Sequence, residues 1–386
     1  MYDTKDRRVA VIRCQTYEAA QIEAAFDEVF AAFPIAQAVS GKTVLIKANL
    51  LAAHKPEKAA TTHPALVSAL AKRLYACGAT SVTIGDSPGG IFTHAALDTI
   101  YRITGMKQAA EESGARLNDD FSETELVSPD GAKTMRLASY VRSADVIISF
   151  AKLKTHTYAR MTGAVKNLYG AVAGLEKAKY HAKLPERTEL AKLICDICDI
   201  VAPDFSLIDG VVGMEGKGPG TGDPKPAGLL IAAQNPHCAD LAAAKLIGMS
   251  PARIPILQES IRRGYAPEQP DQLTIIGLPL QKAAVRFLPP PYMGSAGLLS
   301  LLPGRLRNPV TRLLEPYPFV DPDKCVGCGE CARACPKHTI RIAGGHAVID
   351  HTPCIKCYCC HEMCRLKAIK LKKCLRTPKD GTKKRG

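Results

Sequence analysis

The sequence contains no tryptophan, and only 5% of its 386 residues are aromatic. It also has no uncharged apolar run that approaches the ~18 residues of a membrane-spanning helix. Residues 1–8 carry charges of both signs and lead directly into the short apolar segment 9–12, without the hydrophobic core and small-residue cleavage site of a signal peptide. These absences predict a cytoplasmic protein with no transmembrane segment.

The net charge of +14 is concentrated in two segments. Residues 365–386 contain seven lysines, three arginines and one aspartate, a net +9, and residues 286–312 contain four arginines and no acid, a net +4. The rest of the chain is almost neutral, so we expect no nucleic-acid partner. We interpret residues 374–386 as a basic tail that is either solvated or contacts an acidic redox partner.

Cysteine is abundant and unevenly distributed. Ten of the fifteen cysteines lie between Cys325 and Cys374. Disulfide frameworks belong to small exported proteins, whereas clustered cysteines in a chain without an export signal indicate metal or redox chemistry. The sequence therefore predicts that this chemistry lies near the C-terminus.

These cysteines form an internal repeat with an offset of 29 residues. The first copy has the spacing C-x2-C-x2-C-x3-C-P over residues 325–336. Over residues 319–372 the pattern resembles the two-cluster bacterial-type ferredoxins, in which three cysteines of one repeat and the fourth of the other bind one [4Fe-4S] cluster. The resemblance implies two [4Fe-4S] clusters, one held by Cys325, Cys328, Cys331 and Cys364, the other by Cys354, Cys357, Cys360 and Cys335.

A zinc ribbon is the alternative for paired C-x2-C units. One tetrahedral zinc binds four ligands and would leave half of these eight cysteines unexplained. The sequence departs from the ferredoxin pattern where Arg365 replaces the proline expected after Cys364, and where Cys359 adjoins Cys360. We interpret Cys359 and Cys374 as packing or cluster-proximal thiols.

Residues 1–284 alternate β-branched runs with longer amphipathic segments, which is typical of an α/β fold. We predict a mixed or parallel sheet with helices on both faces, then a proline-rich apolar linker over residues 285–318 that packs across the large domain. A small α+β ferredoxin-like domain over residues 319–373 and the basic tail follow. The expected strands are 8–13, 42–47, 81–85, 145–150, 205–208, 229–232 and 273–277, and the expected helices are 17–32, 64–77, 93–103, 163–175, 186–201 and 238–247.

Polar residues gather at the expected carboxyl ends of the strands, where open α/β sheets bind ligands. Lysines beside free helix N–H groups would suit a carboxylate or phosphate. Three further residues are candidate catalytic groups: Lys166, His156 and Glu215. His156 could act as an acid or base, and Glu215 or Asp209 could position a metal or a proton. The alternative is that the lysines are solvated and that the histidine only caps a strand. The residues expected to bind a small anionic substrate or cofactor are Lys47, Asn49, Asp86, Lys152, Lys154 and Asn167.

Three segments carry a family resemblance: AKLKTH at residues 151–156, MTGAVKNLYG at 161–170 and GMEGKGP at 213–219. Over residues 8–280 the chain closely resembles domain-of-unknown-function family 362, whose members are commonly fused to a two-cluster ferredoxin. The resemblance implies a role in anaerobic metabolism and no settled activity. The glycine-rich lysine segment is also similar to that of the nickel-pincer lactate racemases.

Two functions from different classes stay open. The first is an iron–sulfur electron-transfer protein in which a ferredoxin-coupled oxidoreductase site acts on a small anionic substrate, because a fused electron module is most useful beside a redox site. The second is a non-catalytic electron carrier or assembly factor whose α/β domain docks a partner protein.

Overall fold

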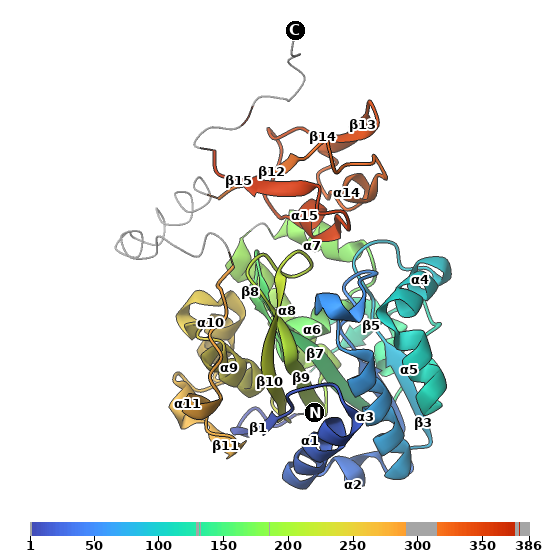
Figure 1. Cartoon of the computed structure of the whole chain (residues 1–386), viewed down its shortest axis with the longest axis vertical. Coiled ribbons are helices and arrows are strands. Elements are labelled where there is room, and N and C mark those ends of the chain that lie inside the picture. The colour runs from blue at the N-terminus through green and yellow to red at the C-terminus, as the bar shows by residue number, and fades with distance from the viewer. Residues whose placement is uncertain are drawn as a thin grey trace.

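A computed structural model describes residues 2–128, 131, 133–184, 186–290, 315–374 and 378. Figure 1 shows a large α/β domain with a small C-terminal domain seated on one end of it, next to α7 (Glu176–Lys183). No helix among these residues has the length and apolar character needed to cross a bilayer. The predicted α/β fold with a small C-terminal domain is confirmed.

The large domain is built on a nine-stranded mixed sheet in the order β11-β1-β10-β9-β7-β2-β3-β4, with β8 paired to β7. Neighbours from β9 to β4 run parallel, whereas β10 is antiparallel to both β9 and β1. The carboxyl ends of the parallel strands therefore meet at one edge of the sheet. The strands are β1 (Arg8–Arg13), β2 (Thr43–Lys47), β3 (Ser81–Gly85), β4 (Arg116–Leu117), β7 (Val146–His156), β8 (Arg160–Thr162), β9 (Phe205–Glu215), β10 (Asp223–Ala233) and β11 (Thr274–Gly277).

Helices cover both faces of the sheet because successive strand residues point to opposite sides. Ile12 packs with α1 to α5 on one face, and Val11 packs with α9 to α11 on the other. A third apolar cluster joins α8 to Leu45 and Ile147. The helices are α1 (Ala19–Ala32), α2 (Ile35–Val39), α3 (Pro64–Ala76), α4 (His94–Thr104), α5 (Met106–Ser113), α8 (Arg187–Val201), α9 (Pro236–Leu246), α10 (Pro255–Arg262) and α11 (Leu280–Ala283).

The small domain contains two copies of one structural unit. Strands β12 (Tyr317–Val320) and β13 (Ile340–Ala343) recur 29 residues later as β14 (His346–Ile349) and β15 (Ile369–Lys372). Pairing is antiparallel between β12 and β15 and between β13 and β14, so each two-stranded sheet takes one strand from each copy. The sequence repeat is thus also a structural repeat, with α14 (Glu330–Arg333) corresponding to α15 (Cys359–Met363).

The largest departure from the expected elements is at residues 163–175. The predicted single helix is wrong: α6 (Ala164–Asn167) gives way to the 3-10 turn η3 (Leu168–Ala171). At Gly170 a Cβ would lie 2.2 Å from Asp86 Oδ1 and 2.3 Å from Lys47 Nζ. The backbone thus passes directly over a buried ion pair there, and the long-range contact overrides the helical pattern.

Other differences are extensions and omissions. Strands β7 and β9 continue to His156 and Glu215, beyond the expected 145–150 and 205–208. Helices α5, α7 and α10 and the hairpin of β5 (Glu123–Val127) with β6 (Thr134–Ala138) were not expected.

Most of the predicted linker and basic tail, at residues 291–314 and 375–386 apart from 378, lies outside the described residues. The start of the linker packs on the large domain, because Phe287 is buried and its N–H donates to Ile247 O.

Candidate functional site

Two cavities in the small domain are lined by cysteines. The first thiol cavity, of about 240 Å³, is lined by Cys325, Cys328, Cys331 and Cys364. The second thiol cavity, of about 20 Å³, is lined by Cys335, Cys354, Cys357 and Cys360. Each cavity takes three cysteines from one repeat and one from the other. Within the described ranges, no group of three or more His, Cys, Asp or Glu side chains is placed to hold a single metal ion.

The loops around the two cavities share an unusual backbone. Gly327 and Gly329 have φ values of 65° and 79°, and their counterparts Lys356 and Tyr358 have φ values of 54° and 63°. This left-handed conformation is favourable for glycine and strained for other residues, so the second loop is held in shape by its surroundings. Both loops therefore curve in the same way around their cysteines.

Backbone N–H groups point at three of the cysteine sulfurs. Cys325 Sγ accepts from Ala347 N at 3.3 Å, and Cys364 Sγ accepts from Ala368 N at 3.2 Å. Cys335 Sγ accepts from the backbone of Thr339 at 3.3 Å. Hydrogen bonds to the ligating sulfurs are one of the factors that set the potential of an iron–sulfur cluster. Four soft thiolate ligands around each cavity, with such donors, fit the [4Fe-4S] group.

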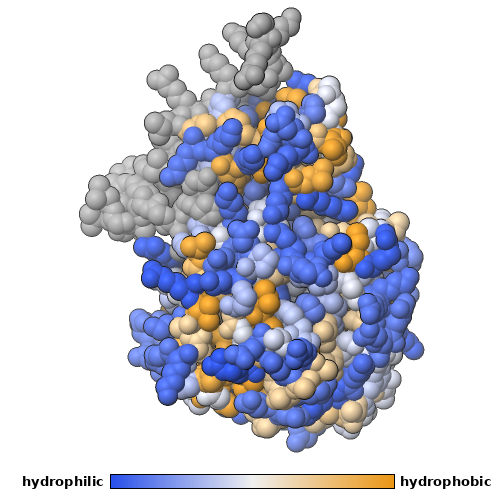
Figure 2. Space-filling view, viewed as in Figure 1, coloured by the Kyte–Doolittle hydropathy of each residue, from blue (hydrophilic) through white to orange (hydrophobic). Residues whose placement is uncertain are grey.

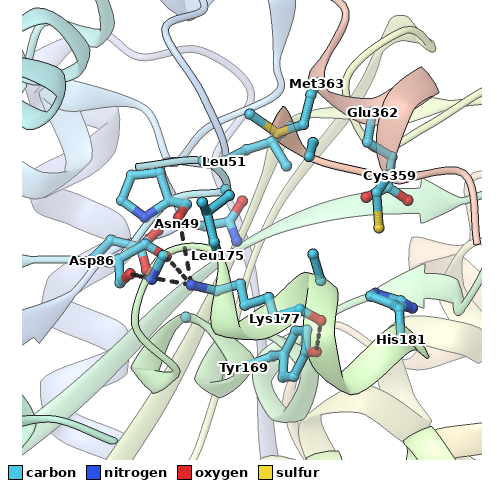
Figure 3. A pocket seen from close by; sticks show the side chains of 18 of the residues that line it. Asn49, Leu51, Asp86, Tyr169, Leu175, Lys177, His181, Cys359, Glu362 and Met363 are labelled. Carbon is cyan, nitrogen blue, oxygen red and sulfur yellow. Dashed lines mark hydrogen bonds between the residues drawn. The ribbon is translucent and has the colours of Figure 1, made fainter. Parts of the chain in front are cut away.

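A third cavity, here called the interdomain pocket, lies where the small domain meets the carboxyl ends of the parallel strands of the large sheet. It has a volume of about 120 Å³. Figure 3 shows Asn49 and Asp86 of the large domain on one side and Cys359, Glu362 and Met363 of the small domain on the other. The predicted site residues that line it are Asn49, Asp86, His156, Lys166 and Asn167.

A buried ion pair forms the floor of the interdomain pocket. Lys47 Nζ, at the end of β2, donates to Asp86 Oδ1 at 2.6 Å and to Asn167 Oδ1 at 3.3 Å. Burial lowers the pKa of Lys47, and the Asp86 carboxylate offsets part of that effect. Asn167 returns two hydrogen bonds, from Nδ2 to Lys47 O and to Ser149 Oγ. These groups satisfy one another and orient the pocket wall.

Lys154 belongs to the same hydrogen-bond network but does not line the pocket itself. Its Nζ donates to Asn49 Oδ1 at 2.6 Å and to Ala60 O at 2.6 Å. Asn49 Nδ2 in turn donates to Asn167 Oδ1 at 3.0 Å. Burial, followed by the charge of Lys166, lowers the pKa of Lys154 well below its usual value. Lys154 thus orients an amide that faces the pocket.

Lys166 differs from the other lysines. Its side chain lines the interdomain pocket, yet within the described part of the chain its Nζ forms no hydrogen bond or ion pair. The ring of Tyr169 lies 5.8 Å away. Burial lowers the pKa of Lys166, with Glu362 opposing that effect. The ammonium is half-buried in the pocket and has no protein partner among the described residues, so this position favours an anionic ligand.

His156 has a defined tautomer. Its Nδ1 accepts hydrogen bonds from Tyr158 N at 3.1 Å and from Ala159 N at 3.2 Å. Burial and the charge of Lys166 hold the pKa of His156 well below its usual value, so the ring is neutral. The proton is therefore on Nε2, which lies 3.6 Å from Glu362 Oε1.

Helix α7 supplies two pocket residues that the sequence analysis missed. Lys177 Nζ donates to Ser87 O at 2.7 Å and to Val172 O, and burial lowers its pKa to about 7. His181 is buried with its ring edge-on to Tyr158, and burial lowers its pKa to about 3. In the sequence these residues lie in a polar segment that resembles a solvated surface, so no local signal pointed to the pocket.

Two predicted site residues lie elsewhere. Lys152 Nζ pairs with Asp209 Oδ2 at 2.7 Å and bonds Tyr17 at 2.9 Å, in a buried group away from the pocket lining. Glu215 accepts from Leu288 N at 2.8 Å at the far end of β9. Both strands are longer than expected. Lys152 therefore lies inside β7 and Glu215 lies at the far end of β9, instead of both following the strand ends at the pocket.

The glycine-rich segment is positioned by a buried carboxylate. Asp240 of α9 accepts hydrogen bonds from Ala164 N at 2.5 Å and Val165 N at 3.2 Å. At Gly163 a Cβ would lie only 2.1 Å from Asp240 Oδ1, so glycine is needed for this contact. Asp240 thereby holds the first turn of α6, which carries Lys166 and Asn167.

Two known proteins are similar to parts of this chain. A thylakoid-associated protein of Synechocystis sp. is 29% identical over 271 residues, which are 68% of this chain and 81% of that protein. Pyruvate synthase subunit PorD of Methanothermobacter marburgensis is 35% identical over 82 residues, which are 21% of this chain and 98% of that protein. The second match covers nearly the whole of a short subunit.

Solved structures give more distant matches. The lactate racemase apoprotein of Thermoanaerobacterium thermosaccharolyticum matches with a TM-score of 0.38 and 14% identity over 63% of this chain, and a Thermotoga maritima protein matches with a TM-score of 0.39 and 12% identity over 60%. This chain spans 59% of the length of each. Similarity at this level carries no inference about function.

Two family profiles match the chain. Residues 318–341 match the 4Fe-4S binding domain, which supports an iron–sulfur electron-transfer role. Residues 44–245, more than half of the chain, match the domain of unknown function named DUF362. The protein therefore belongs to the DUF362 family and carries a C-terminal 4Fe-4S binding domain.

Proposed function

We propose that this protein is a ferredoxin-coupled oxidoreductase, in which the interdomain pocket binds a small anionic substrate or cofactor beside two [4Fe-4S] clusters. The observation that carries the proposal is the Lys166 ammonium. It is half-buried, has no partner among the described residues, and lines the same pocket as Cys359 of the small domain. An anion bound there would supply the missing counter-charge.

The pocket wall comes from residues next to the proposed cluster ligands. Ala334, Cys359 and Met363 line the pocket, and each immediately precedes a proposed ligand in the chain. When bound, the clusters would supply or accept one electron at a time. A substrate in the pocket would then contact residues that are direct chain neighbours of the proposed cluster ligands.

The remaining pocket residues would bind the substrate and hold a proton. Lys166 would contact the anionic group, and the Asn49 amide, oriented by Lys154, lines the same pocket. The neutral His156 holds its proton on Nε2 and would donate a hydrogen bond from it to a bound substrate.

Replacing Lys166 by Met tests this proposal, because Met keeps the apolar stem and removes the charge. Mass spectrometry of small molecules released from anaerobically purified protein identifies the ligand. That molecule should reoxidise dithionite-reduced wild-type protein, and Lys166→Met should bind it at least tenfold more weakly while keeping its iron content. The exposed residue Lys245 on α9 provides the matched control, Lys245→Met. Equal binding by both variants would contradict the proposal.

A second candidate is a carrier that passes electrons without substrate chemistry, with the α/β domain docking a partner protein. Its support is the match between this chain and nearly the full length of a subunit of pyruvate synthase. A protein that carries eight irons, releases no small molecule and transfers electrons equally well in the Lys166→Met variant favours this candidate. We also propose a cytoplasmic location, where a reducing environment keeps thiols free, as all fifteen cysteines are here.

A further inference from the structure

The two repeats of the small domain differ sharply in burial. Tyr358, in the loop of the second thiol cavity, is 1% exposed and packs into an apolar cluster of the large domain. Its hydroxyl donates to Pro316 O at 3.1 Å. The counterpart of Tyr358 in the first repeat is Gly329, which has no side chain to bury. The second loop therefore faces the large domain, and the first does not.

The first loop instead presents apolar side chains to solvent. Six large apolar residues are exposed among those that the structure describes, and three of them line the first thiol cavity. They are Val326 at 68%, Leu366 at 49% and Ile342 at 41% exposure. We call these three residues the apolar collar. Cys328, in the same cavity, is the exposed member of its cysteine set.

The surface around the apolar collar is positively charged. Lys324, Arg341, Arg365 and Lys367 are exposed, lie within two residues of a collar residue in the chain, and form no ion pair in the described ranges. Figure 2 shows orange apolar surface among blue hydrophilic surface on this domain.

Most of the nearby acids are neutralised. Glu330 pairs with Arg333 at 2.9 Å, and Asp321 pairs with Lys370 at 2.7 Å. The rim of the apolar collar thus has more unpaired cations than unpaired acids.

We propose that the apolar collar is the docking surface for an acidic one-electron carrier protein of the ferredoxin or flavodoxin class. Exposed apolar residues in one patch mark interaction surfaces, and a cationic rim steers an acidic partner. This inference rests on the cluster assignment of the proposed function. It adds the path that the electrons take between the carrier and the interdomain pocket. The outward cavity exchanges electrons with the carrier, and the inward cavity serves the interdomain pocket.

The electron step balances without a further reactant. The reduced carrier loses one electron, and the group held by Cys325, Cys328, Cys331 and Cys364 gains it. In the opposite direction the same contact returns one electron to the oxidised carrier. No bond forms or breaks, so the surface needs to provide only proximity, a dry contact and charge complementarity.

The test uses the complete reconstituted protein with a small acidic bacterial two-cluster ferredoxin as the probe. Val326→Glu places a negative charge in the collar. Ile342→Glu does the same from β13, outside the cysteine loop. If Val326→Glu fails to assemble its cluster, Ile342→Glu still tests the docking surface. Val127→Glu is the matched control, because Val127 is 46% exposed on the β5–β6 hairpin.

Two measurements separate docking from assembly. Calorimetric titration with the oxidised ferredoxin should give a Kd at least tenfold higher for the collar variants than for Val127→Glu, and wild-type binding should weaken with added salt. Stopped-flow reduction by the reduced ferredoxin should slow by a similar factor, whereas dithionite, which needs no docking surface, should reduce all proteins at the same rate.

The outcomes distinguish this inference from the proposed function. Equal affinities in collar and control variants, or no binding of the acidic ferredoxin to wild-type protein, would overturn the docking surface. Absence of dithionite-reducible iron in wild-type protein would instead overturn the proposed clusters.

Discussion

Removing the charge of Asp86 tests the role of the buried ion pair beneath the interdomain pocket. Asp86→Asn keeps the size of the side chain and an oxygen that can accept from Leu50 N, which now donates to Oδ2 at 2.7 Å. It removes the counterion of Lys47, whose Nζ lies 2.6 Å from Oδ1 with both side chains buried. The variant therefore isolates the charge of the pair.

The expected cost follows from the burial of Lys47. Breaking a buried pair by neutralising one partner costs about 3–5 kcal/mol, because the other charge stays buried without compensation. For a chain of this size, urea lowers the free energy of unfolding by roughly 3 kcal/mol per M. The unfolding midpoint of Asp86→Asn should thus fall by roughly 1 to 2 M relative to the wild type.

The pH dependence gives a second signature. Without Asp86, burial should lower the pKa of Lys47 further below its unfolded value, so between that lowered pKa and about pH 10 the unfolded chain binds one more proton than the folded chain. Stability rises with pH wherever the unfolded state binds more protons, by about 1.4 kcal/mol per unit for one group. The deficit of the variant should therefore shrink as the pH rises.

Anaerobic urea titrations followed by far-ultraviolet circular dichroism at about pH 7, 8 and 9 measure both effects. The double variant Lys47→Met/Asp86→Asn is the control, because it removes both charges and should be more stable than Asp86→Asn alone. If Asp86→Asn unfolds at the wild-type midpoint, or if the double variant is the less stable of the two, then the reasoning about this ion pair is wrong.

Three further predictions concern other parts of the structure. Gly163→Ala should lose about 1–3 kcal/mol in urea unfolding, because its Cβ would displace the Asp240 carboxylate, and an unchanged midpoint would contradict this. Lys177→Met should flatten the rise of stability with pH above about pH 7, since burial lowers the pKa of Lys177 to about 7 and the unfolded chain binds the extra proton; parallel pH profiles for variant and wild type would refute it. Tyr358→Ala should cost about 3–5 kcal/mol, because it empties a fully buried site between the domains, whereas Tyr358→Phe should cost only about 1 kcal/mol; equal losses would contradict that assignment.

Sequence alone determined those features that depend on spacing along the chain. The 29-residue offset of the cysteines predicted the internal repeat, and the structure shows paired strands and matching backbone conformations at the same offset. The sequence located β1 and β3 correctly, because a short apolar, β-branched run bounded by polar residues marks a strand even where it is buried on both faces, as β1 is.

Only the tertiary structure decided which polar residues share a pocket. Lys47, Asp86 and Asn167 meet because three separate segments end at the same edge of the sheet, whereas Glu215 lies elsewhere because β9 continues past that edge. Lys177 and Glu362 join the pocket from a helix with no local signal and from the other domain. The physical reason is that the cost of burying a charge depends on neighbours that are distant in sequence, so local composition could not reveal which lysine would be left without a partner.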